Sequence, residues 1–427
     1  MKMDDCSQGI VALCDYLHNP LGVNNPTPSF SWRLTGSAGQ QYQYQILVRD
    51  SKDCGRTRSG NCWDSGIVQD HRSIGIPYGG RPLQSCHRYD WQVSVWCDGD
   101  SEPCRGPWNH FETAILHDAE WKALWIEPAT LSPGTTSLIR RSFQVDGPLD
   151  RARLYISGLG YHYVWLNGRR VGDGWLEPGW TNYQKTVLYC VHDITELVES
   201  GENVLGVEIG DGWYGHQHPS FTRYIGHQPS WHSHPKLLFE ISLAFQDGSC
   251  IVVPSRADGE TVSTEGPTVR NSIYDGETYD ATRRIDGWNE RSHRMDWSRW
   301  KPVILSDPPG GIRKAQMMPP IRTTDILPAI GSSRSGPCRT VYDFGQNMAG
   351  VVEVRVSGKR GDRIVLRHAE TLAPEGRINQ ENLRGAQATD IFFLEGIGEE
   401  THEPRFTYHG FRYVEVEAPQ EVQIHEI

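Results

Sequence analysis

Apolar side chains recur at every second position in many short stretches of the chain, which is the pattern of a half-buried β-strand. Clear examples are residues 30–34, 89–96 and 204–209. Between such stretches lie clusters of Gly, Pro, Asn and Asp, which favour turns because Gly tolerates positive φ and Pro fixes φ. Long helical blocks rich in Ala, Leu, Glu and Lys are nearly absent. The pattern therefore predicts an all-β protein.

The spacing of these strands and turns predicts three consecutive β modules. Residues 1–115 show several short strands separated by turns, which is typical of an immunoglobulin-like or fibronectin-like sandwich. A second module is expected at 119–310 and a third sandwich at 320–427. A chain of 427 residues is long enough for each module to bury its own core.

The most aromatic stretch, residues 153–214, lies in the second module and predicts a carbohydrate-binding surface. A sugar ring offers apolar C–H patches and a rim of hydroxyls, so its binding surface combines aromatic faces with a few polar groups. The candidate residues are Trp175, Glu177, Trp180, Asp211, Trp213 and Tyr214.

A second polar segment, residues 273–280, places three carboxylates around a Gly turn between aromatic residues. Two interpretations stay open: a site for a sugar hydroxyl or calcium, and a hydrogen-bonded turn. The chain carries none of the phosphate-binding loop, dinucleotide, nucleophile-elbow or H-E-x-x-H motifs. The catalytic candidates are Asp275 and Glu277 of this segment.

Charge and composition disfavour some classes of binding partner. A net charge of −11 disfavours nucleic acid and anionic membranes, both of which reward basic patches. The acidic N-terminus lacks a signal-peptide pattern, and there is no N-glycosylation acceptor, so we expect a cytoplasmic protein, with secretion left open. Its ten cysteines form no C-x-x-C pair, and the histidines of loop 215–235 match no structural zinc spacing.

Nine short blocks, in order along nearly the whole chain, give it a resemblance to the α-L-rhamnosidases of glycoside hydrolase family 78. The blocks are NPLGV (19–23), FSW (30–32), LNGRRVG (166–172), PGWTNY (178–183), GDGWY (210–214), YDGE (274–277), DFGQN (343–347), RHAE (367–370) and EPRFTYHGFRY (403–413). Each block alone is a weak signal, but their common order is highly specific.

The resemblance implies a fibronectin-like module, a jelly roll related to a rhamnose-binding module, and a concanavalin-like sandwich. In that family a catalytic (α/α)₆ barrel follows these modules, and the printed sequence stops where it would begin. No catalytic residue is carried over, because the family's acid and base lie on the barrel. A related module binds L-rhamnose through calcium near its Leu-Asn-Gly turn, so Asn167 is the calcium candidate, with Glu177 and Asp211 as neighbours. No other cofactor is expected.

Three functions follow as hypotheses. The first is the non-catalytic half of an α-L-rhamnosidase, truncated and without its own hydrolytic centre. The second is a stand-alone binding protein for rhamnose or another carbohydrate. The third is a β-sandwich scaffold that serves as a cyclase or lyase on a small metabolite. In each, the expected partner is an L-rhamnose-containing glycoside or another small molecule.

Overall fold

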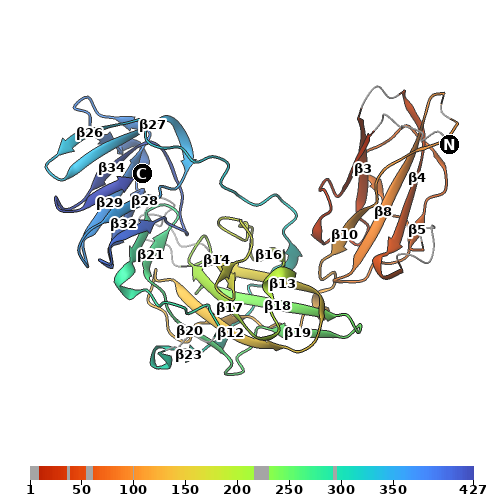
Figure 1. The fold of residues 1–427 in the computed structure, drawn as a ribbon, viewed down its shortest axis with the longest axis horizontal. Helices are drawn as coiled ribbons and strands as arrows, with labels where there is room; N and C mark the ends of the chain where they lie inside the picture. The colour runs from red at the N-terminus through yellow and green to blue at the C-terminus, as the bar shows by residue number, and fades with distance from the viewer. Residues whose placement is uncertain (1–8, 36–38, 54–60, 100, 216–229, 292–295) are drawn as a thin grey trace. The chain divides into compact units, whose positions relative to one another are not determined.

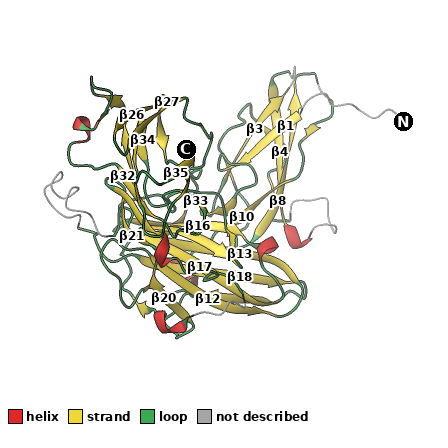
Figure 2. Cartoon of the chain, turned by 60° about the vertical axis from the view of Figure 1, so that its left-hand side comes forward, coloured by secondary structure: helices red, strands yellow, loops and turns green. Residues whose placement is uncertain are grey.

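The computed structural model describes residues 9–35, 39–53, 61–99, 101–215, 230–291 and 296–427. Strands dominate these residues, as Figure 2 shows, so the all-β prediction is confirmed. Helices in the described ranges are single 3-10 turns: η1 (Ser51–Asp53), η2 (Asp118–Glu120), η3 (Thr195–Leu197), η4 (Ala281–Arg283), η5 (Trp297–Arg299) and η6 (Glu381–Leu383). None of them is long and apolar enough to cross a membrane.

Contacts divide the chain into two compact units, residues 1–121 with 313–318 and residues 122–312 with 319–427. Unit 1 contains a three-stranded sheet, ordered β1 (Gly9–Cys14), β3 (Ser29–Thr35), β7 (Ile76–Pro77). Its second sheet is ordered β2 (Leu21–Val23), β10 (Asn109–Thr113), β8 (Arg88–Cys97), β4 (Gln41–Asp50), β5 (Trp63–Asp64), with β6 (Val68–Gln69) on β4 and β9 (Cys104–Arg105) on β8 (Figure 1). Phe30 and Trp91 meet in its core with ring centroids 4.4 Å apart.

Unit 2 begins with two sheets that enclose one apolar core. The first contains β24 (Ile304–Leu305), β11 (Ile126–Glu127), β18 (Lys236–Phe245), β13 (Leu149–Leu159) and β16 (Thr186–Asp193), with β19 (Cys250–Pro254) on β18. The second is ordered β15 (Arg169–Arg170), β14 (Tyr161–Leu166), β17 (Gly201–Gly210), β12 (Ser137–Val145), β20 (Thr261–Glu265), β23 (Lys301–Pro302). Both sheets contribute to the core, for example Ile156 and Phe239 from the first and Val207 from the second. The chain then continues through β25 (Ile312–Ala315).

A further sheet of unit 2 joins two segments that are far apart in sequence. Its order is β21 (Thr268–Ser272), β22 (Gly276–Asp280), β32 (Thr389–Phe393), β29 (Arg363–Ala369), β34 (His409–Glu417), β27 (Arg339–Gly350), β26 (Gly331–Gly336). Strand β22 runs parallel to β32, with Thr278 opposite Ile391. Two smaller sheets are β33 (Glu399–His402), β28 (Val354–Ser357), β35 (Gln423–Glu426) and β30 (Thr371–Leu372), β31 (Ile378–Asn379). Glu277 lies on β22, and Asp275 lies in the turn between β21 and β22.

Candidate functional site

Three aromatic side chains of unit 2 form a row with one exposed end. Trp180 lies against Trp213 with ring centroids 5.4 Å apart and planes inclined by 33°. Trp213 in turn meets the ring of Tyr274 edge-on, at 5.7 Å and 88°. The Trp180 side chain is 58% exposed, whereas Trp213 and Tyr274 are half-buried. Trp180 therefore presents a large apolar surface to solvent on a support of two further rings.

The other aromatic candidates serve packing. Tyr214 is buried and meets Tyr183 edge-on at 5.1 Å. Trp175 is half-buried, and its indole N–H donates to Thr323 Oγ1 at 3.1 Å. Its ring also contacts Tyr163 at 6.0 Å. The sequence analysis named these rings as candidates for one carbohydrate-binding surface, which stays a prediction. It did not separate the exposed face from the core beneath it.

Asp211 is buried beneath a small surface cavity of about 180 Å³. Its backbone N–H donates to Asn271 Oδ1 at 2.7 Å, which ties the end of β17 to β21. The cavity is lined by Leu131, Ser132, Pro133, Gly134, Asp211, His232, Ser233, His234 and Pro235. Most of loop 215–235, including His216, His218 and His227, lies outside the described residues.

The calcium candidate Asn167 forms the turn after β14 at a positive φ of 53°. Its carboxamide bridges that turn to the start of β17. The Nδ2 atom donates to Leu197 O at 3.0 Å and Asn203 Oδ1 at 2.8 Å, and Oδ1 accepts from Val204 N–H at 2.9 Å. Asn167 thus has a structural task, and its role as a calcium ligand stays a prediction.

Asp275 and Glu277, the catalytic candidates, are both buried, with at most 1% of their surface exposed. Glu277 Oε2 accepts hydrogen bonds from the backbone N–H groups of Arg405 and Phe406, both at 3.0 Å. Asp275 Oδ1 accepts from Gln387 N–H at 3.3 Å. These carboxylates hold the loop before β34 and the segment before β32 against the β21–β22 hairpin.

Glu277 belongs to a buried group of charged side chains. Glu208, which is 1% exposed, accepts from the Arg405 guanidinium at 2.7 Å. On the other side, the N–H of Glu277 donates to Asp390 Oδ1 at 2.8 Å. Burial raises the pKa of Glu277 to about 8, and the charges of Glu208 and Asp390 act in the same direction against its two amide donors. Glu277 is therefore mostly protonated at neutral pH.

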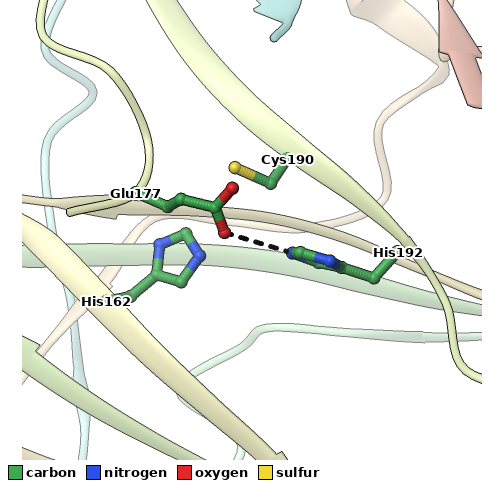
Figure 3. A group of neighbouring side chains, drawn as sticks. All are labelled: His162, Glu177, Cys190 and His192. Carbon is green, nitrogen blue, oxygen red and sulfur yellow. Dashed lines mark ion pairs between the residues drawn. The ribbon is translucent and has the colours of Figure 1, made fainter. Parts of the chain in front are cut away.

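The remaining candidate, Glu177, lies beside three side chains that the sequence analysis did not single out. These are His162, Cys190 and His192, and Figure 3 shows all four side chains gathered around one space. Their separations in sequence match no known motif. The sequence signals for this cluster are the i, i+2 pair of Cys190 and His192 on one strand and the nearby Gly172-Asp173-Gly174 turn.

Comparison with known proteins assigns a family model to each part of the chain. Residues 11–117 match the Rha78A-like N-terminal immunoglobulin domain. Residues 147–325 match the α-L-rhamnosidase N-terminal domain, and residues 333–426 match the bacterial α-L-rhamnosidase concanavalin-like domain.

Curated relatives agree with these domain matches. An α-L-rhamnosidase of Formosa agariphila is 34% identical over 93% of this chain and 43% of its own length. One from Alteromonas is 32% identical over 93% of this chain and 44% of its own length. The chain thus spans less than half the length of these two relatives.

Solved structures match both units. The α-L-rhamnosidase of Dictyoglumus thermophilum is 34% identical, with a TM-score of 0.88 over 97% of this chain and 48% of its own. The Streptomyces avermitilis enzyme, solved with L-rhamnose, is 26% identical, with a TM-score of 0.84 over 98% of this chain and 57% of its own.

Proposed function

The chain belongs to the α-L-rhamnosidase family, of which it carries the immunoglobulin-like, N-terminal and concanavalin-like domains, and we propose that residues 1–427 bind an L-rhamnose glycoside without cleaving it. Family membership supplies the sugar class. The binding role rests on one observation, the exposed indole of Trp180 supported by Trp213 and Tyr274.

The chemistry of this row suits a deoxyhexose. L-Rhamnose carries a methyl group and apolar C–H faces, which pack on an exposed indole, and hydroxyls that need polar partners at the rim. Trp180 precedes Thr181 and Asn182 directly, so polar side chains flank the ring in the sequence. Tyr274, at the other end of the row, contributes a phenol.

We propose that the chain does not cleave the glycoside because the catalytic candidates from the sequence analysis are buried. Hydrolysis of a glycoside with inversion needs two carboxyl groups roughly 6.5–9.5 Å apart that both reach the substrate and a water molecule. Asp275 and Glu277 are buried, and one oxygen of each, Asp275 Oδ1 and Glu277 Oε2, already accepts from backbone amides. Neither carboxyl can contact a substrate while unit 2 stays folded.

Calorimetric titration of the full chain with L-rhamnose and with an aryl α-L-rhamnoside tests the binding role. Trp180→Ala should weaken binding about fivefold, the equivalent of roughly 1 kcal/mol for one lost aromatic contact. Trp297→Ala is the matched control, because that indole is equally exposed, at 57%, and lies outside the row. Equal affinities of the two variants, or no heat with either sugar, would refute a binding site at Trp180.

The same titration and a hydrolysis assay separate this proposal from the other hypotheses. Release of p-nitrophenol from an aryl rhamnoside by the purified chain would overturn the non-cleaving role. Release that persists after Asp275→Asn and Glu277→Gln would in addition place hydrolysis elsewhere. Repeating the titration with and without calcium tests Asn167, because Asn167→Ala should abolish any calcium-dependent gain in affinity. Within the residues that the structure describes, no observation favours a cyclase or lyase.

A further inference from the structure

Four potential metal ligands from three segments converge in unit 2 (Figure 3). His162 lies on β14, Glu177 lies in the loop between β15 and β16, and Cys190 and His192 lie on β16. One ligand atom from each lies within 4.8 Å of all the others. Cys190 and His192 share a face of β16 because they are two residues apart on a strand. Since β14 and β16 belong to different sheets, the cluster connects the two layers of the sandwich.

The two imidazoles in this cluster have hydrogen-bonding capacity that the protein leaves unused. The Nε2 atoms of His162 and His192 are both buried and have no hydrogen-bond partner among the described residues. His192 Nε2 lies 3.8 Å from Glu177 Oε2, which is too long for a hydrogen bond. Buried polar atoms without partners are rare and call for an explanation such as an ion.

Three glycines make the room that these side chains occupy. A Cβ atom at Gly158 would lie 2.9 Å from His162 Nδ1, and one at Gly172 would lie 3.0 Å from His192 Nδ1. A Cβ at Gly174 would overlap the carboxyl group of Glu177. The turn at residues 172–174 therefore leaves space for the His192 and Glu177 side chains, and side chains at Gly172 and Gly174 would fill that space.

We propose that Glu177, Cys190 and His192 bind one divalent transition-metal ion of the zinc class. Thiolate, imidazole and carboxylate are the donors that zinc uses in proteins. With bonds of ~2.0–2.3 Å, a tetrahedral ion holds its ligand atoms about 3.3–3.8 Å apart. The Nε2–Oε2 distance of 3.8 Å already meets that spacing. One thiolate and one carboxylate also neutralise the ion, as a site with little solvent requires.

The protonation states of the cluster suit this role. Burial lowers the pKa of His162 to about 3 and that of His192 to about 4, so both rings are neutral near pH 7. Burial and the nearby Glu177 carboxylate raise the pKa of the Cys190 thiol above its ordinary value. Binding therefore forms the sulfur–metal bond as the thiol proton leaves to the solvent.

His162 acts as a positioning residue rather than a ligand. Its Nδ1 accepts a hydrogen bond from Gly158 N–H at 3.1 Å, so the proton of the neutral ring sits on Nε2. That Nε2–H group faces the cluster, where it can donate to the Glu177 carboxylate once the ion draws the ligands together (Figure 3). The fourth position of the ion is left for water. The Glu177 and His192 side chains keep 12% and 13% of their surface exposed, which provides the route of entry.

Cobalt(II) is the probe, because a cobalt–thiolate bond gives a near-ultraviolet charge-transfer band. The full chain is prepared with Cys250→Ser and Cys338→Ser, which removes its two exposed described thiols. One cobalt ion per chain should bind, show that band and be displaced by zinc. Cys190→Ser should abolish the band. His162→Gln should keep the band and weaken binding about 10- to 100-fold, as loss of an outer hydrogen-bond partner does.

A second buried cluster, His368, Asp390 and His409, provides the internal control because it has no thiol. His409→Gln should leave the band and the affinity unchanged. Cobalt uptake without a thiolate band would show that the ion binds away from Cys190 and overturn the proposal, as would no uptake at all. Should Cys190→Ser fail to fold, Glu177→Gln replaces it: zinc should raise the melting temperature of the parent chain, and an equal rise in E177Q would refute the site.

Discussion

The protonation of Glu277 makes a quantitative prediction about stability. In the folded chain burial raises the pKa of this carboxyl to about 8, against an ordinary value of 4.5. The unfolded chain loses the proton near the ordinary value, whereas the folded chain keeps it until the pH approaches 8. Between these values the folded state binds one extra proton, so the stability falls as the pH rises. Glu277→Gln binds no proton there and removes this slope.

The expected size of this change in stability follows from the pKa shift of Glu277. The free energy of unfolding falls by about 1.4 kcal/mol per pH unit across the roughly 3.5 units between the two pKa values. The parent chain therefore loses on the order of 5 kcal/mol of stability by pH 8. At pH 5 the protonated carboxyl and the carboxamide have the same shape, and each offers one oxygen to the amides of Arg405 and Phe406. The two proteins should therefore be similarly stable at pH 5, and Glu277→Gln should be the more stable one at pH 8.

Thermal unfolding followed by tryptophan fluorescence at pH 5, 6, 7 and 8 measures this difference. The melting temperature of E277Q relative to the parent should rise by on the order of 10 °C across the series, at roughly 2–4 °C per kcal/mol. Glu375→Gln, at an exposed turn, should show no such trend. A gap that shrinks or reverses with pH would mean that the two amide donors outweigh burial and that Glu277 is ionised in the folded chain.

Two further substitutions test how unit 2 is held together. Arg405→Ala should destabilise the chain by about 3–5 kcal/mol in urea unfolding, because it leaves the buried Glu208 without its charged partner. Arg355→Ala, which removes exposed ion pairs to Glu399 and Glu426, should cost less than about 1 kcal/mol. Gly160→Ala should lower the melting temperature sharply or prevent folding, since its Cβ would overlap the Asp211 carbonyl, whereas Gly331→Ala meets no atom within 4 Å and should be neutral.

Local patterns in the sequence were sufficient to find strands, and less reliable where a strand is irregular. Residues 30–34 and 89–96 alternate cleanly and lie within β3 and β8. Residues 343–350 contain Gly345 and two amide side chains, a composition that is typical of a turn. They lie in β27, where Asp343 pairs with Tyr413 but Met348 pairs with Phe411. The surplus residues bulge out at Gly345, whose φ is 82°, and a bulge and a turn call for the same residue types.

The partners of a strand, by contrast, depend on contacts that no local pattern encodes. The alternation around Glu277 predicts neither that β22 pairs in parallel with β32, more than a hundred residues later, nor that its carboxyl ends beneath the amide of Phe406. The zinc-class cluster is the stronger case. His162 and Cys190 meet only because β14 and β16 lie in two sheets that face each other across one core. A search for closely spaced metal ligands in the sequence therefore finds the histidines of residues 215–235. The ligands that converge in the structure lie on strands and a loop that are far apart in sequence, and the alternation of these strands is that of an ordinary core. The position of the proposed metal site thus depends on how two sheets pack against each other. The sequence alone shows only isolated polar residues among apolar ones.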